Sequence, residues 1–149
     1  FDVVHYLQPA VMQRYGLQFA PGNIEKDPLP AGAQYGLVIM TEVLEHLNFQ
    51  PVPSLKKIRA ALSDDGVFFL STPNADGGWG GTTKYYGTLA EIPALDPKAA
   101  WIDGHVWQYN QAELEQVLHD AGFEIRRLER SNGVQGRHFN VWAVKRPSG

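Results

Sequence analysis

Residues 35–47 read YGLVIMTEVLEHL, and their first part is a continuous apolar run. Such a run is typical of a strand buried on both faces of a parallel sheet. Residues 67–71, VFFLS, form a second run of this kind. The intervening residues 53–62 place Leu55 and Ile58 on one apolar helical face. Strand, helix and strand in this order predict an α/β fold.

The alternation continues toward the N-terminus. Asp2–Tyr6 is a short apolar run, and Pro9–Tyr15 has the pattern of a helix. Residues 17–20 are expected to form a further short strand, because Pro21 and Gly22 end the run after them.

The C-terminal part predicts a helix followed by two strands. Asn110 with Glu113 three positions later is the pattern of a capping box. Gly122 suits the position just after the end of that helix. The β-rich segments Phe123–Arg130 and His138–Lys145 follow, and we expect them to pair as an antiparallel hairpin.

Composition narrows the class of protein. The chain has 149 residues, a formal net charge of −3, 44% hydrophobic residues and no cysteine. This length fits a single domain over residues 1–149. The slight acidic excess argues against a partner that is a nucleic acid or an anionic membrane. The absence of cysteine excludes a disulfide framework and a thiol nucleophile. A cytoplasmic location is the expectation, because the first residues lack the basic start of a secretory signal.

A long segment interrupts the regular pattern. Residues 73–104 are rich in glycine and proline and show no helical or strand periodicity. Segments of this length are commonly lids or binding loops. We therefore expect a lid-like insertion within the domain.

The polar residues after the first apolar run are the main catalytic candidates. Glu42, Glu45 and His46 would share one face if this stretch were helical. Ligands of open α/β sheets bind beyond the carboxyl ends of the strands, where these residues stand. His46 could act as a general base toward a hydroxyl acceptor. A weaker alternative is a divalent metal held by the two carboxylates and the imidazole, and a third is a helix start with favourable acidic residues.

Four stretches carry a family resemblance, and they cover nearly the whole chain in a fixed order: 16–30, 35–47, 60–74 and 105–125. They resemble the corresponding segments of class I S-adenosylmethionine-dependent methyltransferases. The resemblance implies a doubly wound, Rossmann-like sheet that ends in an antiparallel hairpin. It also implies transfer of a methyl group from S-adenosylmethionine to an oxygen, nitrogen or carbon of a small-molecule acceptor.

The resemblance extends to individual positions. It implies cofactor contacts from His5, Tyr6, Asn23, Ile24, Met40 and Thr41. It implies acceptor contacts from His105 and Tyr109. No metal ion is expected at the site.

The chain also departs from the family pattern. No glycine-rich cofactor loop occurs before Gly16, so we expect this sequence to lack the first strand and helix of the family. His5, Asn23 and Gly36 stand where the family usually has acidic residues. A truncated sequence is the favoured explanation, and a homodimer that pairs the open strand edge is the second.

Two other functions stay open at this point. The chain could be a degenerate methyltransferase-like module that acts through protein contacts, since the cofactor loop is unseen. The retained residues 42–47 and 71–74 argue against that reading. A metal-dependent hydrolase using Glu42, Glu45 and His46 ranks last, because no further well-spaced ligands are evident.

Overall fold

The computed structural model describes residues 8–30, 32, 34–77, 85–131 and 136–147. Within them the strands form one sheet in the order β1-β2-β4-β3. The strands are β1 (Tyr35–Thr41), β2 (Leu62–Pro73), β3 (Phe123–Arg130) and β4 (His138–Lys145). β1 runs parallel to β2, whereas β4 runs antiparallel to both β2 and β3. The predicted α/β class and the C-terminal antiparallel hairpin are confirmed.

Three α-helices accompany the sheet in the described residues: α1 (Pro9–Tyr15), α2 (Pro51–Ala61) and α3 (Gln111–Asp120). Three short 3₁₀ helices are η1 (Leu44–His46), η2 (Ala75–Gly77) and η3 (Leu89–Glu91). α2 packs on β2 and on α3, and α3 packs on β3. None of the described helices has the length and apolar character needed to cross a membrane.

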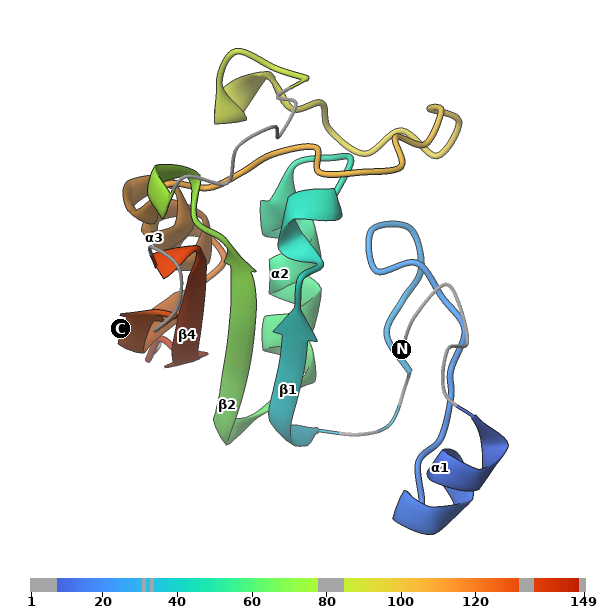
Figure 1. The fold of residues 1–149 in the computed structure, drawn as a ribbon. Coiled ribbons are helices and arrows are strands. Elements are labelled where there is room, and N and C mark those ends of the chain that lie inside the picture. Colours follow the sequence, from blue (N-terminus) through green and yellow to red (C-terminus); the bar gives the residue numbers. More distant parts are fainter. Residues whose placement is uncertain (1–7, 31, 33, 78–84, 132–135, 148–149) are drawn as a thin grey trace.

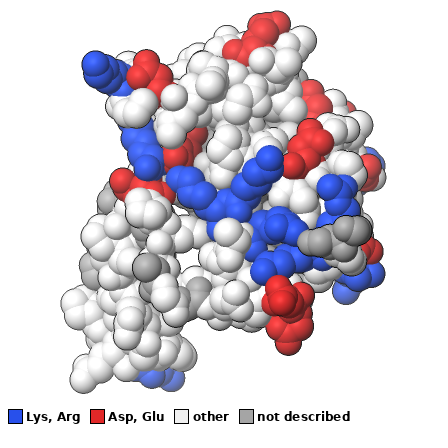
Figure 2. Space-filling model, turned by 180° about the vertical axis from the view of Figure 1, so that it is seen from behind, with Lys and Arg blue, Asp and Glu red and all other residues white. Residues whose placement is uncertain are grey.

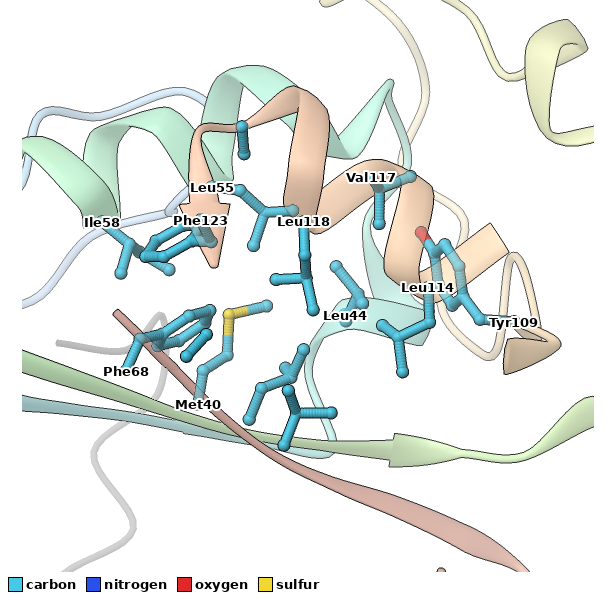
Figure 3. Close-up of a cluster of buried hydrophobic side chains, with 14 of the residues drawn as sticks. Met40, Leu44, Leu55, Ile58, Phe68, Tyr109, Leu114, Val117, Leu118 and Phe123 are labelled. Atoms are coloured by element: carbon cyan, nitrogen blue, oxygen red, sulfur yellow. The ribbon is translucent and has the colours of Figure 1, made fainter. Parts of the chain in front are cut away.

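The core fills the space between the two helices and the sheet (Figure 3). Leu55 and Ile58 come from α2, Leu118 comes from α3, and all three are almost fully buried. They meet Phe68 of β2 and Phe123 of β3, whose ring centroids lie 5.1 Å apart. Burying such side chains stabilises the fold by about 1.5–3 kcal/mol each, so this layer fixes where the strand ends lie.

The opposite face of the sheet is open in the described part of the chain. Leu37 and Ile39 of β1 are 54% and 61% exposed, whereas Val38 and Met40, which alternate with them along the strand, face the helices. The prediction that β1 is buried on both faces is therefore wrong for this structure. The reason is that α2 and α3 share one core with Met40 on a single face, and that β1 is an edge strand of the sheet formed by the described residues.

The N-terminal segment differs from its prediction in one element. The helix over Pro9–Tyr15 is confirmed as α1, but it has no buried residue. Residues 17–20 form no strand, so that expectation is wrong. A strand needs the backbone of a partner, and Figure 1 shows α1 and the segment after it away from the edge of β1. The run Asp2–Tyr6 lies outside the described residues.

The C-terminal elements follow their predictions closely. The Asn110 side chain accepts a hydrogen bond of 2.9 Å from the Glu113 backbone N–H, and the Glu113 carboxylate accepts one of 3.0 Å from the Asn110 N–H. The capping box is thus complete at the start of α3. Gly122 follows the end of this helix with a φ of 86°. This left-handed conformation favours glycine, as the sequence indicated.

Basic side chains of α2 hold neighbouring segments in place. The Lys57 ammonium group donates to the backbone carbonyls of Ile24, Glu25 and Asp27 at 2.7–3.0 Å. Arg59 donates to the carbonyl of Gly122 at 2.9 Å. Figure 2 shows Lys and Arg side chains gathered in a band on this side of the molecule, with acidic groups around them. The Lys57 and Arg59 side chains therefore join segments that are distant in the sequence through hydrogen bonds to backbone carbonyls.

Residues 85–104 of the irregular segment lie over the carboxyl ends of β1 and β2 (Figure 1). Gln50 links it to the start of α2, because its side-chain amide donates to the carbonyls of Leu89 and Ile92 at 3.0 and 2.7 Å. The Asn48 side chain accepts a hydrogen bond of 2.6 Å from the Ile102 N–H. These contacts place the segment next to the predicted site.

Candidate active site

The site is built where β1 ends. Glu42 follows the strand with a φ of 53°, and its N–H donates to the Ser71 carbonyl of β2 at 3.0 Å. A left-handed conformation is costly for a residue with a side chain, and such strain concentrates at functional sites. The turn breaks the strand direction, so that η1 starts at once and brings Glu45 and His46 to the end of the sheet.

Glu45 is the buried centre of the cluster. Its side chain is 0% exposed. Thr72 donates a hydrogen bond of 3.0 Å to Oε2, while Oε1 is buried without a hydrogen-bond partner. Burial raises the pKa of this carboxyl to about 7, and the negative charge of Glu42 adds to the rise. Its own backbone N–H and the Thr72 hydroxyl favour the charged form and oppose the rise, so Glu45 is partly protonated near neutral pH.

Two imidazoles lie beside this carboxyl. The rings of His46 and His105 meet edge to face with centroids 4.7 Å apart. His46 Nε2 is 3.9 Å from Glu45 Oε1. Partial burial, and then the nearby His46, lowers the pKa of His105. The Glu42 charge acts in the opposite direction, and the net lowering leaves His105 largely neutral at pH 7.

Backbone contacts explain how His105 reaches η1 from a distant part of the sequence. The carbonyl oxygen of Glu45 accepts hydrogen bonds from the N–H groups of Val106 and Trp107 at 2.7 and 3.2 Å. Trp107 is buried in the core, which fixes the chain on the far side of this contact. His105 is thus held against the Glu45–His46 pair by main-chain hydrogen bonds as well as by its own ring.

Glu42 connects the site to β4. The Ser71 hydroxyl donates to Glu42 Oε1 at 2.7 Å, and His138 Nε2 lies 3.2 Å from Oε2. Sequence reasoning missed Ser71, Thr72 and His138 as members of this cluster. The signal that could have found them is strand pairing, because β4 places His138 opposite the end of β2.

The predicted cofactor positions that the structure describes have different surroundings. Met40 is 5% exposed and belongs to the core, while Thr41 after it is exposed. The Asn23 side-chain oxygen accepts hydrogen bonds from the N–H groups of Glu25 and Lys26 at 2.8 and 3.2 Å, so it organises its own turn. Ile24 is partly buried against the core. The other two positions, His5 and Tyr6, lie outside the described residues.

The two predicted acceptor contacts have different surroundings. His105 joins the polar cluster, whereas Tyr109 is 1% exposed and packs among apolar side chains (Figure 3). Burial, and then nearby carboxylates, raises the pKa of the Tyr109 phenol, so the hydroxyl keeps its proton. Its backbone also bridges to Asn74 beside the end of β2. Tyr109 is thus a core residue in this structure, and an acceptor contact stays a prediction.

The order of the strands and the helices packed on them define a Rossmann-like α/β domain. The chain belongs to a family of methyltransferases: the family model described as "Methyltransferase domain" matches residues 3–128. The family resemblance seen in the sequence is therefore confirmed.

A curated relative matches part of the chain. Demethylspheroidene O-methyltransferase of Rhodobacter capsulatus is 34% identical over 77 residues, which is 52% of this chain and 19% of that protein. The chain thus aligns with about a fifth of the length of this relative.

Solved structures share the fold. The CcbJ methyltransferase of Streptomyces caelestis has a TM-score of 0.61 at 18% identity, over 85% of this chain and 63% of that one. The 1,6-didemethyltoxoflavin-N1-methyltransferase of Burkholderia thailandensis has a TM-score of 0.63 at 18% identity, over 99% of this chain and 61% of that one. The latter structure contains bound 1,6-didemethyltoxoflavin and S-adenosylhomocysteine. Both likenesses show the fold alone.

Proposed function

We propose that this chain is part of an S-adenosylmethionine-dependent methyltransferase that acts on a hydroxyl group of a small molecule. The observation that carries the proposal is the cluster of Glu42, Glu45, His46 and His105 at the carboxyl ends of β1 and β2. Ligands of open α/β sheets bind at this end. Family membership and an O-methyltransferase among the relatives support the same chemistry.

The residues present fit the cofactor in charge and in access. S-adenosylmethionine supplies an electrophilic methyl group on a positively charged sulfur when it is bound. Thr41 is exposed at the end of β1, and Glu42 next to it presents a half-exposed carboxylate to balance positive charge. The cofactor would be held by the backbone at Met40 and Thr41 and by the turn at Asn23 and Ile24.

His46 is the residue that would take the acceptor's proton. Its side chain is 40% exposed, so an acceptor can reach it. An imidazole nitrogen of His46 would accept the O–H proton of the acceptor, while bound S-adenosylmethionine would supply the methyl group. Glu45 at 3.9 Å would then stabilise the imidazolium that results. A positioned base of this kind contributes about 10²–10⁴ in rate.

His105 and Glu42 would shape the acceptor side of the site. The lowered pKa of His105 keeps its ring neutral, so it can accept or donate a hydrogen bond without adding positive charge. Glu42 is fixed by Ser71 and His138 and so cannot swing away from the strand end. The irregular segment over this edge would cover the bound acceptor and limit water.

The test combines binding and transfer. The 149-residue chain, and in parallel the full natural polypeptide that carries it, is titrated with S-adenosylmethionine and S-adenosylhomocysteine by calorimetry. Each is then incubated with methyl-labelled cofactor and a panel of hydroxylated small molecules. We expect one-site binding and label on at least one acceptor. Folded protein that binds neither ligand in either form overturns the enzyme function and leaves a non-catalytic module. Binding without transfer to any hydroxyl overturns the assigned acceptor group.

A further inference from the structure

We propose that Glu45, His46 and His105 form a binding site for one divalent transition-metal ion, of the class of Zn²⁺. The site is a juxtaposition that only the fold creates: a buried carboxylate and two imidazoles, from η1 and from the end of the irregular segment. Each offers one ligand atom, and these atoms all lie within 4.8 Å of one another.

The separations suit an ion after a small movement. Two ligands at about 2.1 Å from a tetrahedral ion lie about 3.4 Å apart. Glu45 Oε1 and His46 Nε2 are already 3.9 Å apart. The His46 side chain is 40% exposed, so a small rotation of its ring brings the nitrogen into range without disturbing the core.

The buried carboxylate provides an independent sign of a ligand. Glu45 Oε1 is buried without a hydrogen-bond partner and is the oxygen that faces His46. A buried polar atom without a partner costs about 1–3 kcal/mol, and more when it is charged. An ion between this oxygen and the two rings removes that cost, because it neutralises the carboxylate charge and gives Oε1 a partner for its lone pair.

The surroundings of Glu45 resemble those of metal ligands. Thr72 donates to Oε2 and fixes the carboxylate plane, while Val106 and Trp107 donate to the Glu45 backbone carbonyl. Outer contacts of this kind orient ligands and commonly change metal affinity by about 10–100-fold when removed. Glu45 would therefore reach an ion without reorganisation.

The donor types favour a transition metal over magnesium. Imidazole suits Zn²⁺, Co²⁺ and Ni²⁺, whereas Mg²⁺ prefers oxygen ligands. Three protein ligands leave a position open, which is the pattern of metal sites that act on a bound molecule. Resting on the proposed function, this open position would take the acceptor hydroxyl and lower its pKa, which selects acceptors with an oxygen able to coordinate the ion.

The experiment uses Co²⁺ as a coloured probe. The chain is purified without a histidine tag, treated with chelator and dialysed. Co²⁺ is then titrated without cofactor, and visible absorption and calorimetry are recorded. We expect saturation at one ion per chain, with bands that Zn²⁺ abolishes by displacement. His105→Asn and His46→Asn should each weaken binding at least tenfold. His119→Asn, on the exposed surface of α3, should leave binding unchanged.

The outcomes separate this site from the proposed function. Folded wild-type chain that shows no saturable Co²⁺ binding overturns the site, whatever the cofactor titration gives. Equal weakening of Co²⁺ binding by His105→Asn and His119→Asn also overturns the site. Glu45→Gln should weaken binding in the same way, with circular dichroism as its folding control. Co²⁺ binding with the expected mutational pattern supports the site, and it does so even if neither form of the protein binds the cofactor, a result that would overturn the methyltransferase role alone.

Discussion

The Thr72 hydroxyl donates a hydrogen bond of 3.0 Å to one carboxylate oxygen of the fully buried Glu45. This contact satisfies Oε2 and leaves Oε1 facing His46 at 3.9 Å. The carboxyl is thus half-satisfied in an apolar setting, where its neutral form is favoured. Its protonation state should therefore be visible in the stability of the chain.

The first prediction concerns the pH dependence of stability in the presence of a chelator. Burial raises the pKa of Glu45 from 4.5 to about 7 in the folded chain. Between these values the folded state binds more protons than the unfolded state. The contribution of Glu45 is therefore complete below about pH 4.5 and is lost as the pH rises through 7. The loss is on the order of 3 kcal/mol above that range.

Glu45→Gln should flatten this dependence, because its amide does not titrate. The measurement is urea unfolding at several pH values between 5 and 8, in chelator, comparing the variant with wild type. Asp65→Asn removes one carboxylate at an exposed position and serves as the control for net charge. A wild-type stability that rises over this range relative to Glu45→Gln would contradict the assignment.

The second prediction contrasts two adjacent residues of β1. Ile39 is 61% exposed on the open face, whereas Met40 is 5% exposed toward the helices. Ile39→Lys should change the free energy of unfolding of this chain by less than about 0.5 kcal/mol. Met40→Lys should cost about 4 kcal/mol or more, because it buries an unpaired charge. Denaturant unfolding measures both, and a large loss for Ile39→Lys would show that another part of the protein covers this face.

The third prediction concerns the start of α3. Asn110→Ala should destabilise the chain by about 1 kcal/mol, because the Glu113 N–H loses its acceptor. Asn110→Asp keeps an oxygen at the same place and should cost little. Because Asn110 and Glu113 cap each other, the double Asn110→Ala, Glu113→Ala variant should cost less than the two single losses combined. Full additivity in urea unfolding would mean that the two hydrogen bonds act separately.

The elements with local signals were predictable from the sequence. The expected elements with the observed bounds are the strands Phe123–Arg130 and His138–Lys145 and the helix that begins after Asn110. Their signals, a capping box and β-rich runs, are formed by residues close together in the sequence. The burial of β1 on one face alone was not predictable, because an apolar run does not indicate whether one or both faces of the strand are covered by other elements. Among the described residues, helices cover only the Met40 face.

The candidate site was half predictable. Glu42, Glu45 and His46 are close in the sequence, and the prediction of a shared helical face implied that their side chains lie near one another. The structure instead ends β1 at Thr41, turns sharply at Glu42 and keeps a single 3₁₀ turn. The approach of His105 depends on the path of the irregular segment and on two backbone hydrogen bonds to Glu45. No local pattern encodes such a contact.

The last prediction distinguishes a base from a metal ligand in the proposed reaction. If His46 takes the acceptor's proton, His46→Gln should lower kcat by about 10²-fold and leave the Kd for S-adenosylmethionine unchanged. His119→Gln, at the exposed end of α3, should leave kcat unchanged. Transfer of labelled methyl under saturating acceptor measures kcat, and calorimetry measures Kd.

The comparison with His105→Gln identifies the cause. A base that works alone predicts a large loss for His46→Gln and a small one for His105→Gln, with no effect of chelator. An ion shared by both rings predicts losses of similar size, because each variant removes one of three ligands. It also predicts inactivation by chelator and recovery with Zn²⁺ in wild type only. An unchanged kcat in His46→Gln would contradict both roles, since either one requires the imidazole that faces Glu45 Oε1.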